Sequence, residues 1–280
     1  MKCKRIIARL DVKNNALVKG IHLEGLRVLG SPEDFAKKYY IDGIDEIIYM
    51  DVVASLYGRN GLLDLVQKTA KKIFIPLTVG GGVRSLEDVG KLLKSGADKV
   101  CINTAAVKNP ELISKMVEVY GSSTIVVAIE AIKVDGEYLV FIDNGREYTG
   151  IDSVEWARRV EELGAGEILL TSVDQEGTKK GLDYELISLV SNSVNIPVIA
   201  HGGVGSYNDI VNAFDEHNID AVCAASFFHY DALPMIKHND DIVGNKTFIK
   251  SQNIKKDTAG RSIYNLKKML INKGVVIRQS

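Results

Sequence analysis

Short runs of apolar and β-branched residues recur eight times along the chain, with amphipathic helical segments between them. Each run is continuous and does not alternate apolar with polar positions, which is typical of strands buried on both faces. The predicted strands are Arg5–Val12, Glu46–Val53, Ile73–Gly81, Lys99–Ala106, Thr124–Ala131, Glu167–Asp174, Ile196–Gly203 and Ala221–Phe228. Leu86–Ala97 and Val154–Gly166 are two of the helical segments between them. This alternation predicts an α/β fold, a parallel (β/α)₈ TIM barrel, with a doubly wound open sheet as the competing architecture.

An internal repeat sharpens this prediction. PLTVGGGVRS at 76–85 matches PVIAHGGVGS at 197–206, an offset of 121 residues, and DEIIYMD at 45–51 resembles GEILLTS at 166–172 at the same offset. The start-to-start spacing is also unusually long after both the first and the fifth predicted strands. We therefore expect one barrel domain over residues 1–280, made of half-barrels at about 1–120 and 121–230. A polar, lysine-rich insertion at about 232–261 and a terminal helix with its tail at 262–280 complete the predicted domain. The insertion is either a solvated loop or a docking element for a further partner.

Composition and charge exclude several classes of function. Of the 280 residues, 46% are hydrophobic and 25% charged, and the net charge of −1 offers no basic field for nucleic acid. Apolar runs such as Ile125–Ile129 are far too short to cross a membrane, and Arg9 and Asp11 interrupt the apolar N-terminal stretch before it resembles a signal peptide. We expect a cytoplasmic protein with free thiols at Cys101 and Cys223, without a metal or redox cofactor, because none of the five histidines pairs with another at ligand spacing.

Polar residues and glycines gather where the predicted strands end. In such barrels the residues at the carboxyl ends of the strands build the active site. Asp11 and Glu130 occupy equivalent positions in the two halves, so the two acids can divide acid and base roles across the mouth; otherwise each caps a loop. Gly80–Gly82 and Gly202–Gly203 lie where backbone N–H groups can close on phosphate, or they simply allow tight turns. Two such sites would hold a substrate with a phosphate at each end.

Several of these segments resemble one enzyme family. RIIARLDV, DEIIYMDVVAS, IPLTVGGGVRS and GAGEILLTSVDQEGTKKG are similar to the cyclase subunit of imidazole glycerol phosphate synthase, and the resemblance spans residues 1–230. It implies a barrel that docks by its N-terminal face on a glutaminase subunit and receives ammonia through its core. It also implies that this ammonia attacks a bis-phosphorylated ribulosyl formimino aminoimidazole carboxamide ribotide. The products would be imidazole glycerol phosphate and aminoimidazole carboxamide ribotide, which places the reaction in histidine biosynthesis.

The resemblance also implies roles for individual residues. The strand-1 acid of the family falls on Asp11, and its flexible-loop lysine falls on Lys19. The phosphate contacts of the family fall on Gly82, Asn103 and Thr104 in one half and on Gly177, Gly203 and Ser226 in the other. The charged gate through which ammonia enters the barrel falls on Arg5, Glu46, Lys99 and Glu167, all at strand starts. Four charges that converge on a barrel axis are costly to bury unless they pair with one another.

The predicted mouth departs from the family pattern at several positions. Glu130 replaces the strand-5 catalytic aspartate, and Arg9 and His201 replace small residues. After strand 6, Glu176 and Gln175 stand where the family usually has an Asp and an Arg. These departures leave two alternatives to the histidine-pathway cyclase. One is a diverged paralogue that channels ammonia to a separate sugar-amidating enzyme in surface polysaccharide biosynthesis. The other is an isomerase of ribosyl phosphates, against which the gate residues argue.

Overall fold

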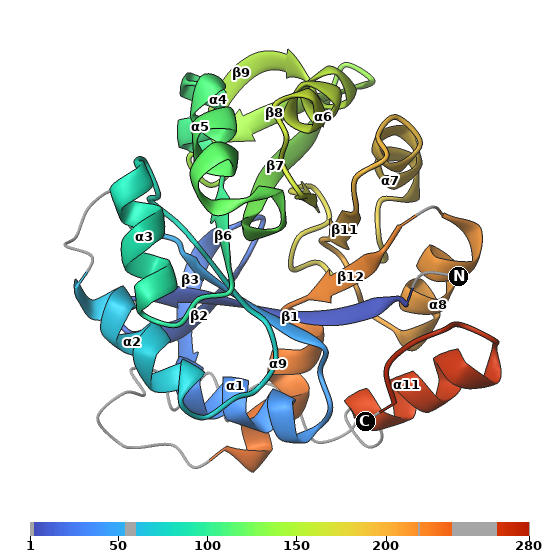
Figure 1. The fold of residues 1–280 in the computed structure, drawn as a ribbon. Coiled ribbons are helices and arrows are strands. Elements are labelled where there is room, and N and C mark those ends of the chain that lie inside the picture. The colour runs from blue at the N-terminus through green and yellow to red at the C-terminus, as the bar shows by residue number, and fades with distance from the viewer. Residues whose placement is uncertain (1–2, 54–59, 218, 237–261, 280) are drawn as a thin grey trace.

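Eight parallel strands close into a barrel, so the predicted (β/α)₈ fold is confirmed (Figure 1). A computed structural model describes residues 3–53, 60–217, 219–236 and 262–279. Each barrel strand pairs in parallel with the next, and β10 closes the circle by pairing with β7. The barrel strands are β1 (Arg5–Lys13), β4 (Glu46–Asp51), β5 (Leu77–Gly80), β6 (Lys99–Ile102), β7 (Ile125–Val134), β10 (Glu167–Ser172), β11 (Val198–His201) and β12 (Ala221–Ala224).

Helices surround the barrel (Figure 1). They are α1 (Pro32–Ile41), α2 (Asn60–Ala70), α3 (Leu86–Lys94), α4 (Thr104–Lys108), α5 (Glu111–Tyr120), α6 (Ser153–Glu162), α7 (Tyr184–Ser191), α8 (Tyr207–Glu216), α9 (Ser226–Ala232) and α11 (Ile263–Asn272), with 3₁₀ turns η1 (Ser122–Thr124) and η2 (Leu233–Met235). Side-chain caps set several of the starts. Ser206 accepts a hydrogen bond from Asp209 N–H and completes a capping box at α8, and the Asp152 side chain caps α6 by accepting from two backbone N–H groups of its first turn. Among the described helices, none is long and apolar enough to cross a membrane.

The continuous hydrophobic runs follow from two separate layers of core. On β1, Ile6, Ala8 and Leu10 face outward and join the large cluster beneath the helices. Ile7 lies between them in sequence and belongs to a smaller cluster inside the barrel. Since successive side chains of a strand point to opposite faces, a strand with apolar surroundings on both sides needs apolar residues at every position.

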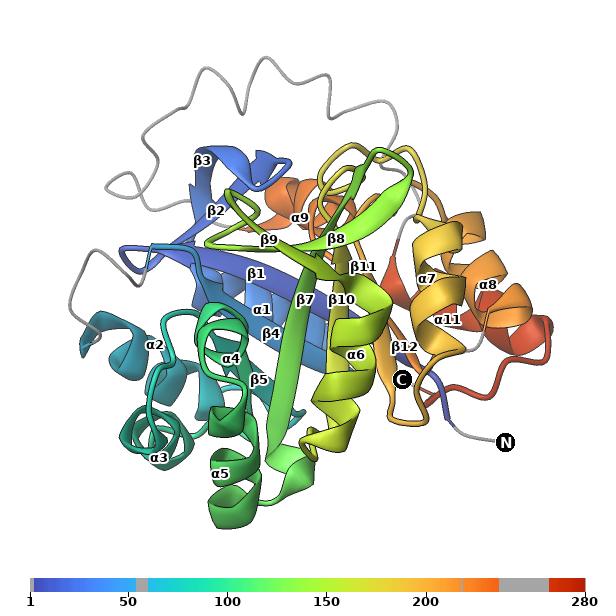
Figure 2. The same ribbon diagram turned by 90° about the horizontal axis from the view of Figure 1, so that it is seen from above.

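Two antiparallel hairpins were not predicted from the sequence. β2 (Ala16–Ile21) and β3 (Glu24–Gly30) follow β1, while β8 (Glu137–Ile142) and β9 (Glu147–Asp152) follow β7. They account for much of the long spacing after the first and fifth barrel strands. Figure 2 shows both hairpins at the same end of the barrel. Each half of the sequence therefore carries a hairpin after its first barrel strand.

Several predicted strand boundaries were wrong at the carboxyl ends. The predicted strand at 99–106 ends at Ile102, and α4 begins at Thr104. The predicted strand at 221–228 ends at Ala224, and α9 begins at Ser226. In both cases apolar residues continue past the strand because the helix that follows also buries apolar side chains, one in α4 (Ala106) and most of those in α9, so hydrophobicity alone did not mark the boundary.

The C-terminal segment packs against the start of the barrel. Lys4 forms a β-bridge with Ile277, and the buried carboxylate of Asp45 accepts hydrogen bonds from Lys267 and Arg278. The end of the chain is therefore attached at the N-terminal face. Of the predicted insertion at 232–261, residues 237–261 lie outside the described residues, and η2 occupies 233–235. The division into half-barrels near residue 120 stays a prediction.

Candidate active site

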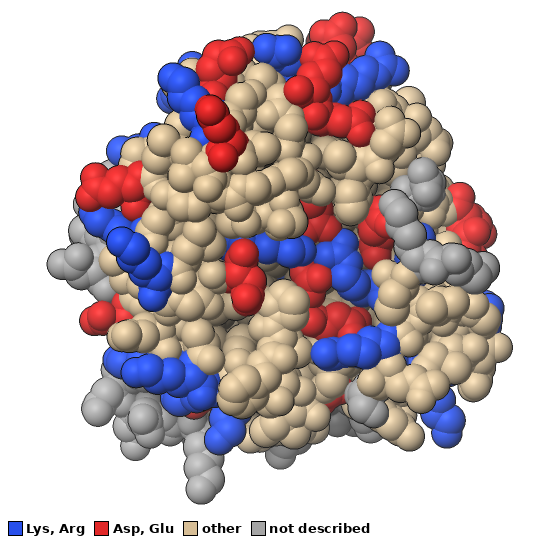
Figure 3. All heavy atoms as spheres, in the orientation of Figure 1, with Lys and Arg blue, Asp and Glu red and all other residues tan. Residues whose placement is uncertain are grey.

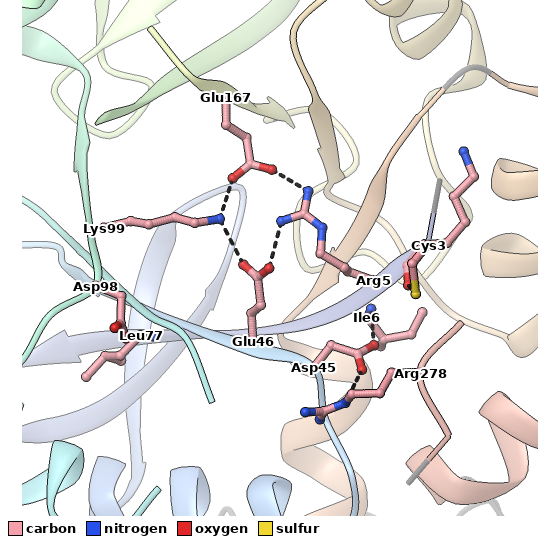
Figure 4. A network of polar contacts seen from close by, with 11 residues as sticks. Cys3, Arg5, Ile6, Asp45, Glu46, Leu77, Asp98, Lys99, Glu167 and Arg278 are labelled. Carbon is pink, nitrogen blue, oxygen red and sulfur yellow. Dashed lines mark hydrogen bonds and ion pairs between the residues drawn. The ribbon is translucent and has the colours of Figure 1, made fainter. Parts of the chain in front are cut away.

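A closed ring of ion pairs lies at the N-terminal face of the barrel. Arg5 contacts both Glu46, at 2.7 Å between Nη1 and Oε1, and Glu167. Lys99 also contacts both carboxylates, with Nζ 3.4 Å from Glu46 and 3.0 Å from Glu167. Figure 4 shows the four side chains converging from four different strands, and Figure 3 shows charged side chains gathered in the middle of this face. The four predicted gate residues therefore come together, and each charge has two partners of opposite sign.

Apolar side chains fill the barrel above this ring. The inward-facing residues next along the strands form the inner cluster: Ile7, Ile48, Cys101, Val126, Ala128, Leu169, Ile199, Ala221 and Cys223 are among its members. Cys101 and Cys223 are buried free thiols, as predicted, and burial raises the pKa of Cys101 to about 12. The layer between the ring and the mouth is thus apolar and uncharged at neutral pH.

At the mouth, Asp11 is enclosed by cations. Arg9 Nε donates a hydrogen bond to Asp11 Oδ1 at 2.8 Å, and Lys19 Nζ lies 4.0 Å from Asp11 Oδ2. Lys19 forms a second ion pair with Glu176, whose other oxygen accepts the Leu23 N–H. All four charged side chains are buried. Burial opposes ionisation of Asp11, but the charges of Arg9 and Lys19 outweigh it and hold the pKa of that carboxyl below its usual value.

Glu130 has a different environment. It lines a cavity of about 420 Å³ at the mouth, and its Oε2 accepts a hydrogen bond from Gly145 N–H at 2.9 Å. Burial is the dominant influence and raises the pKa of Glu130 to about 7, although Arg9, Gly145 and Asn103 favour the ionised form. Two acids at one mouth therefore have pKa values displaced in opposite directions, which is a requirement for separate acid and base roles.

The two predicted phosphate sites differ in the space they offer. Gly82, Asn103 and Thr104 line the same 420 Å³ cavity as Glu130. Gly177, Gly203 and Ser226 are also brought together, but the cavity between them measures only about 10 Å³. At Gly203 φ is +98°, and a Cβ would lie 1.9 Å from the carbonyl oxygen of Gly181, so only glycine fits there. Thr104 and Ser226 begin helices and do not belong to the strands predicted at 99–106 and 221–228.

Comparison with known proteins identifies the family. The family model described as "Histidine biosynthesis protein" matches residues 5–234. Two relatives named "Imidazole glycerol phosphate synthase subunit HisF" are similar over most of their length. The chain is 59% identical over 206 residues to that of Legionella pneumophila, covering 73% of this chain and 97% of the relative. It is 49% identical over 242 residues to that of Alkaliphilus metalliredigens, covering 85% and 96%. The chain belongs to the HisF family.

Sequence reasoning missed one part of the site in this HisF-family chain, the loop between β8 and β9. Gly145 N–H binds Glu130, and the Asn144 side chain donates a hydrogen bond to the carbonyl oxygen of Val52 at 2.8 Å. The signal was present, because Asn-Gly directly after an apolar run indicates a hairpin turn whose residues need positive φ. Both residues have it, at 59° and 75°. The loop was overlooked because the segment after the fifth predicted strand was not assigned to any structure.

Proposed function

We propose that this chain is the cyclase subunit of an imidazole glycerol phosphate synthase and that its reaction takes place at the mouth between Asp11 and Glu130. The substrate is the bis-phosphorylated ribulosyl formimino aminoimidazole carboxamide ribotide, and the added nitrogen is ammonia. The products are imidazole glycerol phosphate and aminoimidazole carboxamide ribotide. One observation supports this site beyond family membership: two acids with opposite pKa shifts lie at the mouth of a barrel whose other end carries a closed charged ring.

The two glycine-lined sites bind the phosphates in this proposal. The open one at Gly82, Asn103 and Thr104 shares its cavity with Glu130, so a phosphate held there brings the ribulosyl end of the substrate to that acid. The second, at Gly177, Gly203 and Ser226, is nearly closed and must widen to admit its phosphate. Holding the substrate at both ends fixes the reacting carbon between the acids, which is how binding energy reduces the entropic part of a barrier.

A glutaminase docks at the N-terminal face and delivers ammonia through the ring. Two features of this face support the proposal. Phe74 is 81% exposed beside a surface cavity of about 350 Å³, which Ile73, Pro76 and Asp98 also line. A second cavity of about 270 Å³ lies against Arg5, Lys99 and Glu167 of the ring. An exposed aromatic side chain next to a charged opening offers both an anchor for a partner and an entrance.

A turnover assay tests this function. Purified chain, ammonium salt and the ribotide are expected to yield imidazole glycerol phosphate and aminoimidazole carboxamide ribotide in equal amounts. Asp11→Asn keeps the shape of the side chain and removes its charge, and we expect it to abolish product formation. A lack of turnover by the folded wild-type chain at high ammonium concentration would refute the cyclase function.

One observation favours a second candidate, in which the chain passes ammonia to a separate sugar-amidating enzyme. Arg9 forms a buried ion pair with Asp11, at 2.8 Å between Nε and Oδ1. The cyclase function requires that Asp11 take part in the reaction while this ion pair is present. The same assay separates the two candidates. Glutamine-dependent release of ammonia by the complex without any conversion of the ribotide would support the ammonia-transfer function.

A further inference from the structure

We infer that Arg9 divides the work between the two acids at the mouth: it fixes Asp11 as a permanent carboxylate and leaves Glu130 as the residue that carries the proton. This inference rests on the proposed cyclase function and assigns the acid and base roles within it. Arg9 acts through Asp11 and is therefore a positioning residue. Glu130 is the catalytic acid.

The first support is the fixed position of Asp11. It follows Arg9 by two residues on β1, so both side chains point into the barrel. Arg9 is 1% exposed and Asp11 is 2% exposed, and the guanidinium binds the carboxylate through Nε at 2.8 Å. Lys19 lies on the other carboxylate oxygen at 4.0 Å. To accept a proton, Asp11 would have to leave the buried guanidinium of Arg9 without its ion-pair partner and Lys19 with Glu176 alone, which opposes protonation.

The second support is the access of Glu130 to substrate. Glu130 lines the 420 Å³ cavity, whereas Asp11 is not among the residues that line it. The neighbours of Glu130 that carry or can gain a charge come from several elements around the cavity. They are Arg9 and Asp11 on β1, Cys101 on β6, Asp51 at the end of β4, Asp143 on the β8–β9 loop, and Arg84 and Lys108 on the cavity wall.

The third support is an unused donor on Arg9. Its Nη2 is buried and has no hydrogen-bond partner among the described residues. The charge of Arg9 acts on Glu130 as well as on Asp11. When Glu130 gives up its proton, this guanidinium is therefore available to stabilise the carboxylate that forms. A single arginine can thus keep one acid ionised throughout and support the other acid only while it is ionised.

In the addition step, Glu130 is the only side chain that gives a proton, and it receives one back. The lone pair of ammonia forms a C–N bond to the ribulosyl carbonyl carbon, and the C–O π pair moves to oxygen. Glu130 gives its proton to that oxygen, and the ammonium nitrogen then returns one proton to Glu130. The product is a neutral carbinolamine, and Glu130 is again a carboxylic acid. Asp11 neither gains nor loses a proton and stabilises the transient positive charge on nitrogen.

Infrared spectroscopy tests the assignment without turnover. The C=O band of a protonated carboxylic acid is followed from pH 5 to 9 in wild type, Glu130→Gln and Asp11→Asn. We expect a band that disappears near pH 7, is absent from Glu130→Gln and persists in Asp11→Asn. A band that persists in Glu130→Gln and vanishes in Asp11→Asn would overturn the inference.

Kinetics at a fixed concentration of free NH₃ provide the second measurement. Glu130→Gln is expected to lower kcat by about a hundredfold or more, and wild-type kcat is expected to fall as the pH rises through about 7. Arg9→Met frees Asp11 to titrate, so a new loss of activity appears on the acidic side, and Arg9→Lys removes that loss. A pH profile of Arg9→Met that matches wild type would refute the role of Arg9. If no variant and no wild type turns over, the cyclase function fails, and the infrared titration still decides which acid holds the proton.

Discussion

Replacing Asp45 with asparagine is expected to destabilise the attachment of the C-terminal helix to the barrel. Asp45 is 6% exposed and uses both oxygens: Oδ2 accepts Ile6 N–H at 2.8 Å, and Oδ1 accepts Lys267 Nζ at 2.6 Å and Arg278 Nε at 3.2 Å. Lys267 is 2% exposed. Asn has nearly the same shape as Asp, so the substitution removes the charge with little change in packing and leaves Lys267 as a buried cation without a counter-ion.

The magnitude follows from the two ways in which Lys267 can respond. If it stays charged, the loss of its buried partner costs about 3–5 kcal/mol. If Lys267 instead releases its proton at pH 7, the cost is the free energy of deprotonating an amine of ordinary pKa 10.5 at that pH. At 1.36 kcal/mol per pH unit this is about 5 kcal/mol. We therefore expect Asp45→Asn to lower the free energy of unfolding by about 3–5 kcal/mol. For a chain of this size, that corresponds to a fall in Tm of roughly 6–12 °C.

Thermal and urea unfolding of four variants measure this effect. Lys267→Met alone leaves Asp45 bound to Ile6 and Arg278, so its expected cost is smaller than that of Asp45→Asn. The double variant removes the stranded charge and is expected to be more stable than Asp45→Asn alone. Glu87→Gln removes an exposed ion pair with Lys91 and serves as the matched control, with an expected change below about 0.5 kcal/mol. A cost under about 1 kcal/mol for Asp45→Asn, or a double variant less stable than that single variant, would refute the reasoning.

Three further predictions concern the mouth and the ring. Lys99→Met leaves Arg5 as the only cation between the two ring carboxylates. We expect glutamine-driven turnover to fall further than ammonium-driven turnover. An equal fall in both rates would contradict the passage of ammonia through the ring. Burial raises the pKa of Glu130 from 4.5 to about 7, so its ionisation opposes folding. The contribution of the protonated Glu130 side chain to the free energy of unfolding is fully present below pH 4.5 and is lost as the pH rises through 7. Glu130→Gln is therefore expected to be about 3 kcal/mol more stable than wild type at pH 8, with little difference at pH 4, as measured by urea unfolding. Gly203→Ala places a Cβ against Gly181 and is expected to weaken binding of the ribotide in calorimetry, whereas Gly121→Ala, at a positive φ with open space around it, leaves binding unchanged.

The barrel could be predicted because strands buried on both faces carry a signal in every residue. The repeat at an offset of 121 residues and the matching long gaps added a second, independent constraint. The hairpins escaped because the sequence argument looked for continuous apolar runs. β9 (Glu147–Asp152) has no fully buried residue, and β3 (Glu24–Gly30) is buried only at its end, so neither produces such a run. Edge strands of this kind are held by turns and cross-strand pairing, which apolar runs do not record.

The candidate site was predictable in its positions and less so in its electrostatics. Strand alternation and the family resemblance placed Asp11, Glu130 and the four ring residues, and the structure brings them to the two ends of one barrel. Which acid is exposed to the cavity depends on the direction taken by the Arg9 side chain, a long and flexible group whose partner is fixed by three-dimensional packing. The closed state of the second glycine site likewise depends on distances between loops.

Each hairpin makes its key contacts with the opposite half of the sequence. The β2–β3 hairpin donates from His22 N–H to the carbonyl oxygen of Glu176, and the β8–β9 loop reaches Val52 through Asn144 and Thr104 through Asp143 N–H. Each half of the sequence therefore supplies a hairpin that completes the mouth on the other half. A half that has folded alone cannot complete either acid's surroundings. The chain can thus bind substrate only after both halves have folded and joined. A newly made chain becomes active only at the end of folding.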